Sequence, residues 1–159
     1  MDDQSATPPA RRLQPIPRSL PAILMRAREA VMTRVRPVLR AYDMTEPQWR
    51  VLRTLASIEE VEVTQLAEMV FLLPSSLSRI LKDLTERGLI QRRTSASDLR
   101  KGLVSISDQG MALIEAATPE AAKVTAEIER LFGGDRLGRL IGLLEELEEA
   151  VGPGQPAAD

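Results

Sequence analysis

The sequence contains neither cysteine nor histidine among its 159 residues. Without cysteine the chain has no disulfides, no thiol redox sensor and no thiolate metal site. Without histidine it lacks the commonest general base and the commonest transition-metal ligand. No glycine-rich phosphate loop or nucleophile–base set is visible, and paired carboxylates such as Glu145 and Glu149 fall on a helix face with a solvated pattern. The sequence therefore predicts a protein that is not an enzyme and needs no metal and no cofactor.

Long apolar runs are also missing. No stretch reaches the length needed to cross a membrane, and residues 1–17 hold four prolines but no apolar core of an export signal. We therefore expect a cytoplasmic protein with no membrane partner. The composition predicts a disordered N-terminal arm at 1–18 and a disordered tail at 152–159. The chain is otherwise long enough for one domain with a real core.

The net charge of −2 is unevenly distributed along the chain. Residues 64–107 carry 7 Lys/Arg and 4 Asp/Glu, whereas residues 108–159 carry 4 and 11. A basic middle beside an acidic end fits a protein that presents one face to a polyanion. It fits equally well a soluble protein whose last helix has an acidic, solvated face, so charge alone does not decide.

Hydrophobic periodicity predicts a mainly α (α+β) fold with the element order α-α-α-α-β-β-α-α. The first helix opens at Ser19, the second starts at a Thr45–Gln48 capping box, and a strand-like connector at 59–63 precedes a short helix at 65–70 that Thr64 caps. The fourth helix spans 74–87 and Gly88 closes it. Strands follow at 89–94 and 102–106. Ser107 caps a helix that runs towards Leu131 with a break or kink at 118–120, and Asp135 caps the last helix.

The terminal helices, 19–44 and 108–151, carry long apolar stripes and enclose a small head at 45–107. Such stripes can pack within one chain or between two. A small head with long terminal helices favours pairing between chains, so we expect dimerisation helices and a homodimer. The head has the order of a winged helix-turn-helix domain.

The helix at 74–87 is the first candidate for DNA binding. Its apolar stripe leaves small hydroxyl residues and two cations, Arg79 and Lys82, on the opposite side. Hydroxyls and free N–H groups of a first turn bind phosphate, and arginine can pair with guanine in the major groove. For this helix considered by itself, the alternative is an ordinary amphipathic helix whose polar side faces solvent.

The hairpin that follows favours DNA. Arg92 and Arg93 end its first strand, Arg100 and Lys101 begin the second, and Asp98 lies near enough to hold Arg100. Such a loop can lay arginine into a minor groove. The candidate DNA-binding residues are Ser75, Ser76, Ser78, Arg79, Lys82, Arg92, Arg93, Asp98, Arg100 and Lys101.

Several segments together resemble the MarR family of bacterial winged-helix regulators over about residues 19–151. They are the stretches 77–81 and 84–90, the pair Arg92-Arg93, and residues 98–100 followed by 104–107. Residues 27–30, 36–37 and 45–53 are similar to the branch that regulates homoprotocatechuate (4-hydroxyphenylacetate) degradation. The resemblance implies an obligate dimer, two recognition helices in successive major grooves of a palindromic operator, and repression relieved by a small, often aromatic, anionic ligand. Leu73 and Pro119 depart from the family pattern.

A ligand site is predicted at Arg28 and Trp49. Arg28 borders the buried stripe of the first helix, where a cation can pair with an aromatic carboxylate while Trp49 stacks on the ring. The alternative is a structural salt bridge at Arg28 and a core role for Trp49. For the whole chain, the sequence predicts a DNA-binding repressor released by a small aromatic carboxylate or phenolic effector. The alternative is a winged-helix module that binds protein partners without specific DNA binding.

Overall fold

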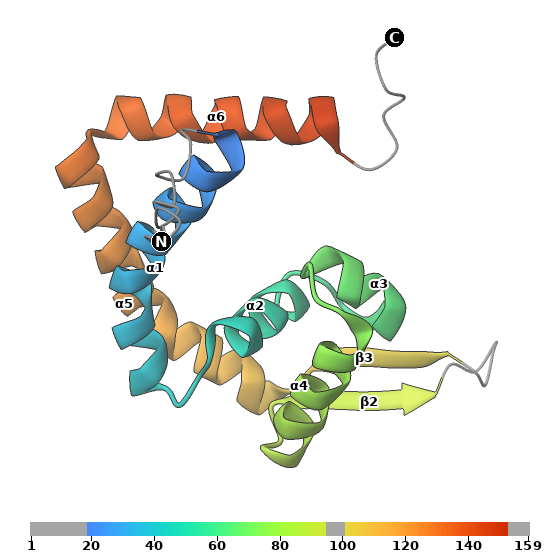
Figure 1. Cartoon of the computed structure of the whole chain (residues 1–159). Coiled ribbons are helices and arrows are strands. Elements are labelled where there is room, and N and C mark those ends of the chain that lie inside the picture. Colours follow the sequence, from blue (N-terminus) through green and yellow to red (C-terminus); the bar gives the residue numbers. More distant parts are fainter. Residues whose placement is uncertain (1–18, 95–100, 153–159) are drawn as a thin grey trace, which may run out of the picture.

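The computed structural model describes residues 19–94 and 101–152. Within these ranges it has six helices and three strands (Figure 1). Their bounds are α1 Leu20–Ala41, α2 Glu46–Leu55, β1 Val61–Glu62, α3 Val63–Met69, α4 Pro74–Glu86, β2 Ile90–Thr94, β3 Gly102–Ile106, α5 Asp108–Phe132 and α6 Gly134–Val151. The predicted fold class is confirmed, and the element order differs by one short strand.

That strand, β1, lies within the segment predicted as a connector. It pairs antiparallel with β3, Val61 opposite Val104 and Glu62 opposite Leu103, which gives a sheet of order β1-β3-β2. Two residues are too few to show a period-2 pattern in the sequence. The strand forms because the unpaired backbone N–H and C=O groups at the edge of β3 pair with it. This pairing depends on tertiary structure, because β1 and β3 are far apart in the sequence.

The core of the head lies between α2, α3, α4 and the sheet. Its fully buried side chains come from each of these elements: Leu52 and Leu55 from α2, Leu66 from α3, Leu77, Leu81 and Leu84 from α4, and Val104 from β3. The three leucines of α4 follow the spacing expected of a helix with one buried stripe. Burial of each leucine contributes roughly 1.5–3 kcal/mol, so this stripe fixes which side of α4 faces solvent.

The local capping signals at three element ends are confirmed. Thr45 accepts from the backbone N–H of Gln48, and the Gln48 side chain accepts from the Thr45 N–H at 2.8 Å, which completes the capping box. The Ser107 hydroxyl accepts from the Gly110 N–H at 3.0 Å. Gly88 has φ +70°, the left-handed conformation that glycine adopts without strain. These ends are determined locally.

Two predicted helix starts are wrong. α3 begins at Val63, so Thr64 lies inside the helix and Glu62 is the N-cap. Gly133 is the N-cap of α6, and Asp135 lies in its first turn. Of the break or kink predicted at 118–120, the break is not formed, because α5 continues through Pro119 as one helix. Packing against α1 holds it in register there, because the Tyr42 hydroxyl donates to the Ala116 carbonyl at 2.8 Å. Such contacts outweigh the one hydrogen bond that proline removes.

The terminal helices form a separate base beside the head. α1 packs along α5, and α6 turns away from the end of α5 at Gly133 (Figure 1). The head, with β2 and β3 extending beside α4, lies at the other end of α5 (Figure 1). Within the described residues no helix is both long and apolar enough to cross a membrane.

Candidate nucleic-acid interface

α4 is held to the head on one side and open to solvent on the other. Its leucine stripe is buried, and the Gln48 amide donates to the Asp83 carboxylate at 2.6 Å, which ties the helix to α2. The opposite side is exposed and carries the candidate residues Ser75, Ser76, Ser78, Arg79 and Lys82. The structure therefore brings these five together on one surface, while their role in DNA binding stays a prediction.

The polar side chains on this surface differ in whether they already have a hydrogen-bond or ion-pair partner within the chain. The Ser78 hydroxyl donates to the Pro74 carbonyl at 2.9 Å, and Lys82 lies 3.8 Å from the Glu86 carboxylate on the next turn. The Arg79 guanidinium has no hydrogen bond or ion pair with any residue of the described ranges. A guanidinium without an intrachain partner can place its fork of donors on a base edge at no cost in broken contacts.

The cations of the hairpin differ in whether a carboxylate pairs with them, a difference that the sequence alone does not show. Arg92 is exposed, and its side chain has no partner in the parts of the chain that the structure describes. Arg93 instead forms a bidentate pair with Glu60, with Nε 2.7 Å from Oε1, and Lys101 Nζ lies 2.7 Å from Glu62 Oε1. Asp98 and Arg100 lie outside the described residues. Sequence reasoning missed Glu60 and Glu62, which precede their partners Arg93 and Lys101 by 33 and 39 residues.

Arg28, the predicted partner of Trp49 in a ligand site, does not line the hollow that contains Trp49. Arg28 forms an ion pair with Glu46 at the start of α2, and Arg50 also reaches that carboxylate at 3.2 Å. Arg36 bonds Glu29 and lies 3.7 Å from the second oxygen of Glu46. Hydrogen bonding from Arg36 lowers the pKa of Glu29 and raises the pKa of the Arg36 guanidinium. Arg28 therefore belongs to an ion-pair network that joins α1 to α2.

Trp49 follows Glu46 by three residues on α2 and is half-buried against the core of the head. It lines a hollow of about 360 Å³ between α1, α2 and α5, together with Val35, Arg53, Thr118, Ala121, Ala122 and Thr125. The cation in this hollow is Arg53, which the sequence interpretation did not single out. The signal was present: Arg53 follows Trp49 by four residues, and residues four apart share a helix face.

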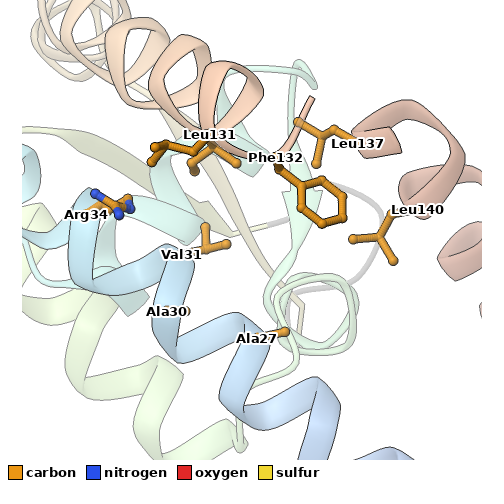
Figure 2. Close-up of a pocket in the computed structure, with 9 residues that line it drawn as sticks. Ala27, Ala30, Val31, Arg34, Leu131, Phe132, Leu137 and Leu140 are labelled. Atoms are coloured by element: carbon orange, nitrogen blue, oxygen red, sulfur yellow. The ribbon is translucent and has the colours of Figure 1, made fainter. Parts of the chain in front are cut away.

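A second, more apolar hollow lies in the base, between α1 and the corner of α5 and α6. Figure 2 shows residues of its walls. The hollow has a volume of about 350 Å³ and is lined by Ala27, Ala30, Val31, Arg34, Ile128, Leu131, Phe132, Leu137 and Leu140. Arg34 lies at one edge and pairs with Glu127 of α5 at 2.8 Å. The remaining lining is hydrocarbon, and the hollow continues into exposed apolar side chains of α6.

Comparison with known proteins places this geometry in a family. The model of the MarR family matches residues 44–101. The homoprotocatechuate degradative operon repressor of Escherichia coli is 34% identical over 128 residues, which is 80% of this chain and 86% of that protein. The transcriptional regulator PA4135 superposes with a TM-score of 0.81 at 33% identity, over 87% of this chain and 98% of that chain.

A second solved structure is that of NadR in complex with 4-hydroxyphenylacetate. It superposes with a TM-score of 0.73 at 32% identity and covers 85% of this chain and 96% of that chain. The matches extend over the base as well as the head. The chain therefore belongs to the MarR family of winged-helix, DNA-binding transcriptional regulators and is not an enzyme.

Proposed function

We propose that the protein is a homodimeric repressor that binds a palindromic operator and is released by a small aromatic acid. The observation that carries the DNA contact is the exposed side of α4, which carries three serines and Arg79 within its first two turns. This surface combines phosphate-binding hydroxyls with an unengaged guanidinium for base edges. The paired cations Arg93 and Lys101 add positive charge at the hairpin, which Glu60 and Glu62 partly neutralise.

The dimer is supported by the base. α6 is an 18-residue helix with no buried residue in the single chain. Exposed large apolar side chains gather on α1, the end of α5 and α6, including Leu24, Val31, Leu131, Leu140, Ile141 and Leu144. A face of this size is stable in water only when a partner covers it, and a second copy supplies the same apolar stripes. Two-fold symmetry then presents two α4 helices to two half-sites, so the operator is palindromic.

The effector is supported by the hollow at Trp49 and by the relatives. NadR was solved with 4-hydroxyphenylacetate, and the repressor from Escherichia coli controls a homoprotocatechuate degradative operon. In this chain the indole of Trp49 can stack on an aromatic ring while Arg53 pairs with its carboxylate. Arg53 suits this role better than Arg28, whose guanidinium is already paired with Glu46. Because the hollow touches both α1 and α2, a bound ligand can bias the position of the head on the base.

The test begins with selection of bound duplexes from a random pool. Phenylacetates and benzoates with ring hydroxyls are then titrated against the complex while operator release and tryptophan emission are followed. Trp49 is the only tryptophan, so the emission reports on this hollow alone. We expect Arg53→Ala to weaken effector binding tenfold or more and to leave operator affinity intact, while the matched variant Arg28→Ala retains the effector response. An emission and an operator affinity that no aromatic acid changes would refute the effector role.

A further inference from the structure

The turn between α3 and α4 exposes two large apolar side chains beside the proposed DNA surface. Phe71 is 76% exposed and Leu73 is 72% exposed, the two highest values among the large hydrophobic residues of the described ranges. Neither belongs to the base, where apolar side chains are left for a second copy. Leu73 instead immediately precedes Pro74, the first residue of α4.

Both positions hold residues that local backbone preferences disfavour. Leu73 is the N-cap of α4 and offers no side-chain cap, where a serine, threonine or aspartate would contribute about 1 kcal/mol. Phe71 has φ +51°, a conformation that glycine or asparagine adopts at lower cost than a bulky residue. Departures from local rules without a gain inside the chain concentrate at functional sites. The gain must therefore lie in a contact outside the chain.

The turn presents these side chains on a fixed backbone. The Val70 carbonyl accepts from Arg50 Nη1 at 2.8 Å, and the Phe71 N–H donates to the Glu68 carbonyl at 3.1 Å. The Leu72 N–H donates to the Ala67 carbonyl at 3.0 Å. Val70 is fully buried and anchors the start of the turn. The exposed side chains are thus positioned before any partner arrives, which lowers the entropy cost of binding.

The residues around Phe71 and Leu73 indicate which chemical group can bind there. A hollow of about 520 Å³ is lined by Thr64, Ala67 and Glu68 of α3 and by residues 71–74. None of these lining residues is basic, and Glu68 adds a negative charge, so a phosphate is repelled here. At the major-groove edge of a base pair, the one apolar substituent is the C5-methyl group of thymine. That group fits the hydrocarbon of Leu73 and Phe71 next to the polar residues of α4.

We infer that Leu73, with Phe71 behind it, is a specificity residue that recognises thymine methyl groups at the edge of each half-site. This inference rests on the proposed DNA-binding role of α4 and adds a base preference to it. Leu73 contacts an apolar group at the N-terminal end of α4, while Arg79, six residues further along, contacts a base edge. The selected operators should then contain thymine at a fixed number of base pairs from the base that Arg79 contacts.

The test uses selected duplexes in which single thymidines are replaced by deoxyuridine, a change that removes only the methyl group. Affinities of the full-length dimer are measured by fluorescence anisotropy for the unmodified protein and for Leu73→Ala, Phe71→Ala and Met69→Ala. Met69 is the matched control, because it is a neighbouring apolar residue, 47% exposed, that does not line the hollow. All three changes are at exposed positions, and thermal unfolding verifies that each variant folds.

We expect deoxyuridine at one position of each half-site to weaken binding about fourfold per methyl group, the value for one buried group of that size. Leu73→Ala should abolish this dependence, Phe71→Ala should reduce it, and Met69→Ala should retain it. A dependence equal in Leu73→Ala and the unmodified protein would overturn the inference, as would the absence of any deoxyuridine effect. A change of oligomeric state in Leu73→Ala that leaves the methyl effect intact would also overturn it, because the turn would then contact a protein. Failure to bind any duplex would instead contradict the proposed function.

Discussion

Replacing Glu60 with glutamine should strengthen DNA binding. Glu60 holds Arg93 in a bidentate pair at the edge of the hairpin, and the Arg93 side chain is 58% exposed in that pair. A phosphate that approaches Arg93 must either break this pair or accept a guanidinium whose charge is already neutralised. Glutamine keeps the size of the side chain and removes the charge, so Arg93 becomes available to DNA.

The magnitude follows from the exposure of the pair. Exposed ion pairs contribute about 0.2–1 kcal/mol each, and a dimer that uses both hairpins releases two of them. The expected gain is then about 2-fold to 30-fold in affinity, from 1.36 kcal/mol per factor of ten. If each Arg93 neutralises one phosphate after the change, the slope of log affinity against log salt should steepen by about 0.9 per hairpin.

The assay is fluorescence anisotropy with one selected duplex and one scrambled duplex over a range of salt concentrations. The gain should occur on both duplexes, because phosphate contacts carry no sequence information. Glu120→Gln is the matched control: it makes the same change in charge and breaks the Lys123 pair of α5, away from the hairpin. It should change affinity far less than Glu60→Gln.

Two results would refute the reasoning. Unchanged or weaker binding by Glu60→Gln would show that the pair orients Arg93 for DNA and does not compete with it. A gain that persists in Glu60→Gln combined with Arg93→Ala would show that the effect comes from net charge alone.

Three further predictions concern other parts of the molecule. Arg79→Ala should relax base preference in a repeated duplex selection, whereas Arg92→Ala should weaken binding to all duplexes and lower the salt slope by about 0.9 for each phosphate that Arg92 no longer neutralises. Gly110→Ala should lower the melting temperature, because a Cβ there would lie 2.1 Å from the Leu89 carbonyl oxygen and 2.8 Å from Ile106, so the start of α5 must shift; an unchanged melting curve would contradict this. The carboxyl of Glu29 should titrate in NMR below its ordinary pKa, because the Arg36 hydrogen bond favours its charged form. That contribution to stability is present above the ordinary pKa and is lost as pH falls through the lowered one, and Arg36→Ala should return the Glu29 pKa towards its ordinary value.

Much of the fold follows from local sequence. The leucine spacing of α4 predicted its buried side, and with it the exposure of Arg79 on the other. The Thr45 capping box, the Ser107 cap and the left-handed Gly88 were each predicted from residues within four positions of the feature. Such features are determined by the sequence because their donors, acceptors and torsions belong to neighbouring residues. The family was likewise recognisable from short segments of the head.

The tertiary structure decided what distant residues do to one another. Arg93 and Glu60 are 33 residues apart and meet only because β1 pairs with β3 at the edge of the sheet. Arg28 forms an ion pair with Glu46 on another helix, and Arg53 lies beside Trp49 in the hollow where α1, α2 and α5 meet. Helix periodicity says which side of an element is buried. It does not say which charge from another element comes within a few ångströms, and Coulomb energies at such distances depend on that placement.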